Sequence, residues 1–116
     1  MQEYVEVCTS SDIENGNIKA FSVRGQEILI AKIENAIYAA SGTCPHMKAK
    51  LSRGTLRDTI ITCPRHASQF DLKDGHVVRW TNLSGITLAT SKLFRSPRPL
   101  KIFPVKVEEG KIFIEM

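Results

Sequence analysis

The chain has 116 residues, of which 42% are hydrophobic and 24% are charged, and these values suit one globular domain. No stretch approaches the roughly 20 apolar residues of a membrane-spanning helix, and the acidic N-terminus lacks the apolar run of a secretory signal. The sequence therefore predicts a cytoplasmic protein with no membrane partner. Its three cysteines are then expected to stay reduced, and metal binding or catalysis is expected of any cysteine that lies in a motif.

Charge is unevenly placed along the chain, which carries a formal net charge of +4. Residues 1–43 hold six acids and three bases, whereas residues 44–75 hold six bases and three acids. Residues 81–104 hold four bases and no acid. This asymmetry predicts a basic face. Such a face suits nucleic acid or an acidic protein surface, and the plainer interpretation is a solvated surface.

In chain order, a possible single helical turn at Ser11 to Asn15 is followed by short β-prone runs separated by turn signals. The runs are residues 18–23, 27–33, 36–39, 59–62, 105–108 and 112–114. The turn signals are Arg24-Gly25, Glu34-Asn35 and Glu109-Gly110. Short strands at this spacing predict an all-β sandwich or barrel. Thr43 to Arg53 and Cys63 to Gln69 are predicted loops, and residues 80–98 have weak periodicity with a possible hairpin around Asn82 to Gly85.

Two small clusters carry the candidate chemistry: Cys44-Pro45-His46 and Cys63-Pro64-Arg65-His66, with sixteen residues between them. Each follows a β-prone run, so both are expected on loops displayed by a rigid sheet. Two thiolates and two imidazoles suit either tetrahedral zinc or an iron–sulfur cluster. The single residue between Cys44 and His46 is tighter than zinc sites usually have. The spacing therefore favours two cysteines on one iron and two histidines on another.

This pattern resembles the Rieske [2Fe–2S] ferredoxins, over roughly residues 3 to 116. Other matching features lie between and after the two clusters. They are Leu51, Gly54, Ile60 or Ile61, Phe70-Asp71-Leu72, Asp74-Gly75, Pro99-Leu100, Val105 and Glu109-Gly110. The resemblance implies a single domain, residues 1–116, of stacked antiparallel sheets, sandwich- or barrel-like. A two-loop cluster-binding subdomain would comprise residues of about 43–54 and 62–70, with a longer variable segment at about 80–98.

The resemblance also implies one [2Fe–2S] cluster per chain. Cys44 and Cys63 would ligate the inner iron, and His46 and His66 the outer iron near solvent. Pro45 and Pro64 would stiffen the loops, and Met47 would cap the apolar side of the cluster. The histidine ligands would lose a proton more readily when the iron is oxidised, so the potential would fall as pH rises.

The sequence departs from the family at several positions. Ala67 stands where many members have glycine, and the extra cysteine of each loop in the high-potential members is absent. Ser68 matches a hydroxyl that those members place near the cluster, but Phe70 replaces their tyrosine. Hydrogen bonds to cluster sulfur raise the potential. One missing donor predicts a potential near the lower end of the Rieske range, roughly −150 mV rather than +300 mV.

The resemblance therefore implies a one-electron carrier, not an enzyme in itself, which passes electrons from a reductase to a terminal oxygenase or similar redox enzyme. The partners would have acidic docking surfaces, and neither nucleic acid nor membrane is expected to bind. The bases that flank the proposed cluster are Lys48, Lys50, Arg53 and Arg65. The alternatives are the small subunit of a nitrite-reductase-type complex and a structural zinc-binding module, which could bind nucleic acid through its basic loops.

Three further residues are expected to play no part in the chemistry. Cys8 is expected to be a small buried residue of the first strand. His76 is expected to be exposed after the Asp74-Gly75 turn, and Trp80 to pack under the long segment.

Overall fold

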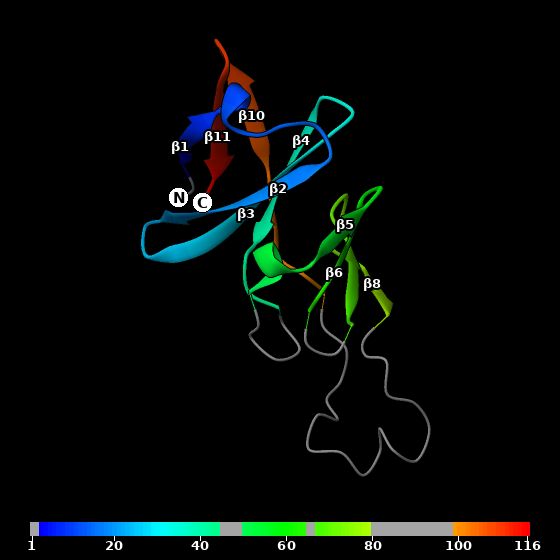
Figure 1. Cartoon of the computed structure of the whole chain (residues 1–116). Helices are drawn as coiled ribbons and strands as arrows, with labels where there is room; N and C mark the ends of the chain where they lie inside the picture. The colour runs from blue at the N-terminus through cyan, green and yellow to red at the C-terminus, as the bar shows by residue number, and fades with distance from the viewer. Residues whose placement is uncertain (1–2, 45–49, 65–66, 80–98) are drawn as a thin grey trace, which may run out of the picture.

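The structure is a computed structural model that describes residues 3–44, 50–64, 67–79 and 99–116. These residues form three antiparallel sheets and two short 3-10 turns (Figure 1). The predicted all-β fold of stacked antiparallel sheets is therefore confirmed. The predicted hairpin near Asn82 and the packing of Trp80 fall outside the described residues.

The terminal sheet brings the two ends of the chain together, in the order β1-β11-β10. Its strands are β1 (Tyr4–Thr9), β11 (Lys111–Glu115) and β10 (Val105–Glu108). The backbone N–H of Glu3 donates to the carbonyl of Met116 at 3.1 Å, and the two termini lie side by side in Figure 1. The predicted Glu109-Gly110 turn joins β10 to β11.

The central sheet has the order β2-β3-β4-β9. Its strands are β2 (Asn17–Val23), β3 (Gln26–Ile33), β4 (Ala36–Ser41) and β9 (Ile102–Phe103). Both predicted turns are present, and both residues of each have positive φ: 51° and 78° at Arg24-Gly25, and 49° and 69° at Glu34-Asn35. Two positive φ values in a two-residue turn match the right-handed twist of the strands that it joins, which fixes the hairpin register.

The loop-bearing sheet has the order β5-β6-β7-β8 and consists of three-residue strands. Its strands are β5 (Thr55–Arg57), β6 (Ile60–Thr62), β7 (Gln69–Asp71) and β8 (Val77–Arg79). At one end, Thr55, Thr62, Gln69 and Arg79 lie opposite one another across the strands. At that same end the chain passes from β6 into the second predicted loop.

The two faces of the central sheet line two separate hydrophobic cores. From β3, Leu29 and Ala31 contribute to the core beneath the loop-bearing sheet, which we call the loop-side core. Ile28 and Ile30 contribute to the core against the terminal sheet, which we call the terminal-side core. Because side chains alternate across a strand, β3 is buried on both faces. The central sheet is thus the middle of three layers.

The structure differs from the sequence prediction in several places. The predicted helical turn at Ser11 to Asn15 is a 3-10 turn, η1 (Ser10–Asp12), which begins and ends earlier in the sequence. The Asp12 carboxylate accepts the backbone N–H of Thr9 at 3.0 Å. A second 3-10 turn, η2 (Leu51–Arg53), lies in the predicted loop 43–53. Strands β5 and β9 were not predicted, because two or three residues show no periodicity. The predicted loop 63–69 ends one residue early, because Gln69 begins β7.

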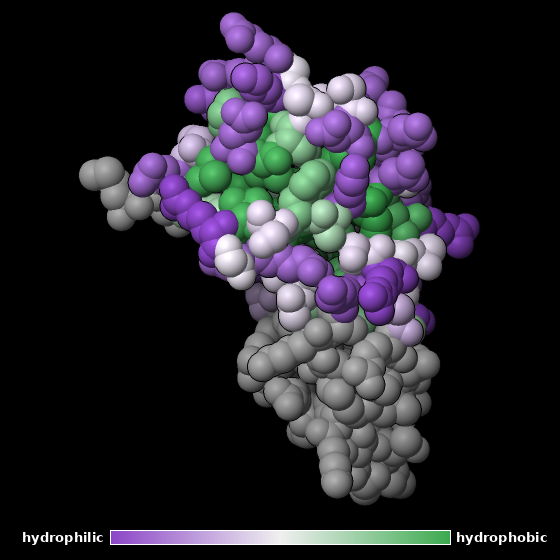
Figure 2. All heavy atoms as spheres, turned by 60° about the vertical axis from the view of Figure 1, so that its left-hand side comes forward, coloured by the Kyte–Doolittle hydropathy of each residue, from purple (hydrophilic) through white to green (hydrophobic). Residues whose placement is uncertain are grey.

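The surface view in Figure 2 shows apolar residues in the middle of one face with hydrophilic residues around them. The large apolar side chains that are exposed among the described residues are Tyr4, Val78 and Val107. Within the described ranges, no helix is long and apolar enough to cross a membrane.

Candidate metal centre

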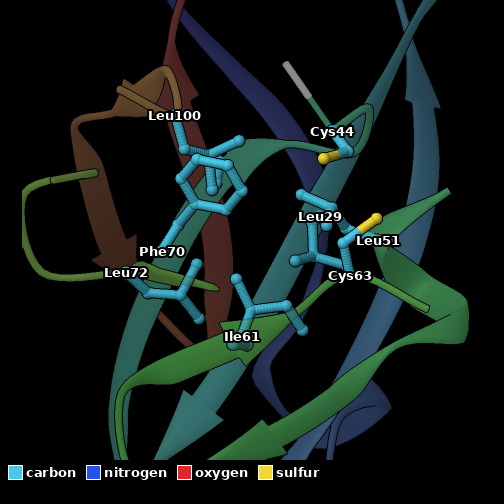
Figure 3. Packing of buried hydrophobic residues seen from close by; sticks show 10 residues of the cluster. Leu29, Cys44, Leu51, Ile61, Cys63, Phe70, Leu72 and Leu100 are labelled. Carbon is cyan, nitrogen blue, oxygen red and sulfur yellow. The ribbon is translucent and has the colours of Figure 1, made fainter. Parts of the chain in front are cut away.

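Two of the three cysteines enter the same core from different elements. Cys44 lies three residues beyond the end of β4, and Cys63 directly follows β6. Their exposed fractions are 0% and 2%, and both belong to the loop-side core. In Figure 3 the two cysteines and Leu51 lie on one side of this core, with Phe70 on the other. Folding therefore gathers two thiols in one apolar environment.

The first predicted loop is closed at its base by an isolated β-bridge and a backbone hydrogen bond. Thr43 pairs with Lys50, and the N–H of Leu51 donates to the carbonyl of Gly42 at 2.9 Å. Leu51 is completely buried, so it anchors the returning chain in the core. A Cβ added at Gly42 would lie 2.7 Å from the side chain of Glu27, so glycine is needed for this close approach.

The second predicted loop is closed at its base by a backbone hydrogen bond. The N–H of Cys63 donates to the carbonyl of Ser68 at 2.7 Å, and Ser68 is completely buried. Ala67 has a φ of 58°, in the left-handed region. The guanidinium Nε of Arg79, on β8, donates to the Ala67 carbonyl at 3.0 Å. Ala67 is thus held by the neighbouring strand, next to the hydrogen bond that closes the base of the loop.

Gly54 brings the return of the first loop against the start of the second. A Cβ at this position would collide with the backbone carbonyl of Thr62, the residue before Cys63. A hydrogen atom fits there, and no side chain does. The close packing of β5 on β6 therefore depends on glycine at this position.

The structure places some of the predicted site residues and leaves others undescribed. Cys44 and Cys63 come together, whereas His46 and His66 lie outside the described residues. The same is true of four residues expected to flank the cluster: Pro45, Met47, Lys48 and Arg65. Among the flanking bases that are described, Lys50 and Arg53 are exposed, and Lys50 lies 3.8 Å from the Glu27 carboxylate.

The third cysteine lies in a different environment. Cys8 is in β1 and belongs to the terminal-side core, on the far side of the central sheet from Cys44 and Cys63. Burial raises the pKa of the Cys8 thiol, and the negative charge of Asp12 raises it further. A thiol with a raised pKa stays protonated at neutral pH, so it is a poor metal ligand. The expectation of a buried structural residue is confirmed.

The third histidine is exposed, as predicted. The Nδ1 atom of His76 lies 2.6 Å from Asp74 Oδ1, which also accepts the backbone N–H of His76 at 3.0 Å. This backbone hydrogen bond, followed by that of the imidazole, lowers the pKa of the Asp74 carboxyl. The pair forms the turn between β7 and β8, at the opposite end of β7 from Ser68.

The sequence interpretation missed Arg79. Its contact with Ala67 depends on the pairing of β7 with β8, and neither strand was delimited from the sequence. The sequence could have pointed to Arg79 only through its position opposite Gln69, and that position is known only when the register of β7 and β8 is known.

The donor set fits an iron–sulfur cluster. Cys44 and Cys63 are cysteines buried in one apolar core and supplied by two different chain segments. Iron–sulfur clusters are held by cysteine thiolates, and in the Rieske type two histidines replace two cysteines on one iron. Two sulfur donors in this core, each followed within three residues by a histidine in the sequence, satisfy that requirement.

Comparison with known proteins agrees with this interpretation. The family model described as the Rieske [2Fe-2S] domain matches residues 3–104. The ferredoxin component of the alkene monooxygenase system of Xanthobacter autotrophicus is 32% identical, over 97% of this chain and 80% of that relative. The ferredoxin component of the naphthalene 1,2-dioxygenase/salicylate 5-hydroxylase systems of Ralstonia sp. is 28% identical, over 99% of this chain and 97% of that relative.

A solved structure agrees as well. The complex of reduced oxygenase and oxidized ferredoxin in carbazole 1,9a-dioxygenase contains a chain that is 28% identical to this one, with a TM-score of 0.75. The match covers 96% of this chain and 91% of that one. This chain therefore belongs to the Rieske [2Fe-2S] domain family, and its cofactor is a [2Fe–2S] cluster. The predicted ferredoxin class, an electron carrier rather than an enzyme, is confirmed.

Proposed function

We propose that this chain passes single electrons from a reductase to a terminal oxygenase. The observation that carries the proposal is the pair of buried cysteines, Cys44 and Cys63, which lie in one apolar core just beyond strands of two different sheets. The ferredoxin components of oxygenase systems among its relatives support the choice of partners. When bound, the cluster supplies a one-electron couple.

The ligands that we propose are Cys44 and Cys63 for the inner iron and His46 and His66 for the outer iron. Their support is the sequence pattern together with the shared burial of the two cysteines. The two thiolates would be shielded from water by the loop-side core. The two imidazoles would carry the outer iron toward the partner, because neutral nitrogen ligands replace thiolates there.

The proposal extends to the domain, the location and the potential. Residues 1–116 would form one domain, with cluster-binding residues of about 43–54 and 62–70 and a variable segment at about 80–98. Pairing of β1 with β11 supports one domain, and three cysteines that form no disulfide with one another support a reducing cytoplasm. Phe70, which is completely buried in the same core as both cysteines, has no hydroxyl to donate and supports a low potential.

The decisive test is EPR of the dithionite-reduced protein, together with iron and sulfide analysis. We expect a red-brown protein with about two irons and two sulfides per chain. Its average g value should lie below that of an all-cysteine cluster. A colourless protein that contains zinc would overturn the proposal.

The ligand assignment has matched controls within the chain. Cys44→Ser and Cys63→Ser should each abolish the Rieske spectrum, while Cys8→Ser should leave it unchanged because Cys8 lies in the terminal-side core. His46→Cys and His66→Cys should alter or destroy the spectrum, whereas the exposed His76 tolerates the same change. A wild-type spectrum in any of the four ligand variants would contradict the assignment.

A further inference from the structure

We infer that Arg79 is a positioning residue for the cluster, which fixes the backbone after the second ligand pair and thereby helps to set the reduction potential. The inference rests on the proposed function. Its basis is a hydrogen bond between two elements: Arg79 Nε on β8 donates to the carbonyl of Ala67 at 3.0 Å. Ala67 directly follows His66, one of the proposed ligands.

The contact falls where the backbone is strained. Ala67 has a φ of 58°, in the left-handed region that an L-residue adopts only under strain. Such a conformation persists only where the surroundings over-determine it. The base of the loop is held by the hydrogen bond from the Cys63 N–H to the Ser68 carbonyl. Arg79, on the neighbouring strand, holds Ala67, the residue before Ser68. The guanidinium is the restraint on Ala67 that comes from another strand.

A β-bulge places Arg79 at this position. Gln69 lies opposite Arg79, but Phe70 lies opposite Val77, so Val78 is an extra residue on β8. With an unbroken register, Val78 would stand opposite Gln69. Bulges occur beside functional sites, where they redirect a side chain. Here the bulge leaves Val78 exposed and puts an arginine beside the second loop.

Arg79 belongs to the row of cross-strand neighbours Thr55, Thr62, Gln69 and Arg79, and a side-chain hydrogen bond holds part of this row. The Gln69 side-chain amide donates to the Thr62 hydroxyl at 3.2 Å, which links β7 to β6 directly below the loop. Arg79 continues this row across β8. The carbonyl that it binds belongs to the peptide between Ala67 and Ser68. That peptide is planar, so fixing its carbonyl also fixes its N–H on the opposite side. Ser68, which carries that N–H, is completely buried.

Two consequences for the cluster follow from this geometry. A fixed amide orientation beside the cluster holds one local dipole constant, and dipoles and hydrogen bonds near sulfur tune the potential. The guanidinium also adds a positive charge beside the loop, and this charge favours the reduced, more negative cluster. Removing Arg79 should therefore lower the potential, and releasing Ala67 should make the site heterogeneous.

The test compares three variants of the cluster-loaded protein. Arg79→Leu removes both charge and hydrogen bond, and Arg79→Lys keeps the charge but loses the planar guanidinium. Arg53→Leu is the matched control, since it removes an exposed base near the return of the first loop. The readouts are the midpoint potential, the EPR linewidth of the reduced cluster and the rate of iron loss to a chelator.

We expect Arg79→Leu to lower the midpoint potential, broaden the EPR signal and speed iron loss severalfold. Arg79→Lys should also broaden the signal and speed iron loss, whereas Arg53→Leu should do neither. If Arg79→Lys behaves like wild type, the residue acts only through charge and the positioning role is wrong. If all variants match wild type, the inference fails entirely. A wild-type protein without a Rieske signal would instead contradict the proposed function.

A double-mutant cycle isolates the restraint on Ala67. In Ala67→Gly the left-handed conformation is no longer strained, so less restraint is needed. The effect of Arg79→Leu on EPR linewidth and iron loss should therefore be smaller in the Ala67→Gly background. Additive effects of the two substitutions would show that Arg79 does not act through Ala67.

Discussion

At Ala67 the backbone adopts a conformation that alanine does not favour. The sequence marked this position because alanine stands where many family members have glycine. The structure gives the physical reason, since the backbone there is left-handed with a φ of 58°. Glycine reaches this region freely, and alanine does so only under strain. The departure was readable from the sequence, but its conformational cause was not.

Ala67→Gly should stabilise the protein by about 1 kcal/mol or less, because relief of strain exceeds the added entropy of the unfolded chain. Thermal unfolding of the cluster-loaded protein should therefore show a midpoint a few degrees higher. Ala36→Gly is the control: Ala36 is exposed at the start of β4, and glycine there should destabilise by about 0.5–1 kcal/mol. Equal losses in both variants would contradict the strain at Ala67.

Asp74 makes the stability depend on pH. Its pKa is lowered, so its carboxylate contributes stability that is fully present above the unfolded-state value of about 3.9 and is lost as pH falls through the lower folded value. Asp74→Asn keeps an acceptor for the His76 N–H but removes the charge. Urea unfolding should show a deficit for the variant at pH 7 that shrinks below about pH 4. A deficit independent of pH would refute this origin.

At the scale of elements, the hairpins of the central sheet were predictable and the loop-bearing sheet was largely not. Arg24-Gly25 and Glu34-Asn35 are turn signals between long β-prone runs, and both form the expected turns. Strands β5 and β8 have three residues each, too few for any periodicity. The bulge at Val78 is set by pairing with β7, which is a tertiary effect. The cysteine pair was predictable because its signal lies in sequence spacing.

Gly54 tests how the β5–β6 pairing supports the site. Gly54→Ala would push a methyl group into the Thr62 carbonyl, next to Cys63, so β5 must move away. We expect a loss of about 2 kcal/mol or more in unfolding free energy, with weaker retention of iron. Gly110→Ala is the control, because its φ of 76° brings strain of about 1 kcal/mol with no atom within 4 Å of the added Cβ. Similar losses of iron in both variants would contradict the steric argument.

Metal removal should loosen one sheet before the others. The short strands of the loop-bearing sheet cover the core that contains both cysteines proposed as ligands, whereas the terminal-side core contains neither. When iron is removed by a chelator, hydrogen exchange should accelerate in β5, β6, β7 and β8 well before β1, β10 and β11. Simultaneous loss of protection in all strands would show that the two cores unfold as one unit.

At the scale of the whole molecule, the two ends of the loop-bearing sheet differ in charge. At the end where Cys63 lies, the exposed described bases are Lys50, Arg53 and Arg79. At the opposite end, the bases Arg57 and Lys73 are mixed with Asp58, Asp71 and Asp74. A positive end around the cluster would orient an acidic redox partner before contact, as charge complementarity does for other complexes.

Arg53→Glu should slow electron transfer to an acidic partner severalfold at low salt, and the difference from wild type should vanish at high salt. Lys73→Glu reverses a charge in the turn at the far end and should have little effect. Stopped-flow measurement of the second-order rate constant at several ionic strengths makes the comparison. A wild-type rate that rises with salt would mean that this end repels its partner.

The two-sided burial of β3 has a consequence for how the protein is made. Because one core closes against the terminal sheet without any proposed ligand, a new chain can complete that half before iron arrives. The other half can then accept the metal as its last component. A chain that waits for iron would then be ordered in its terminal-side half and open where the cluster has to enter.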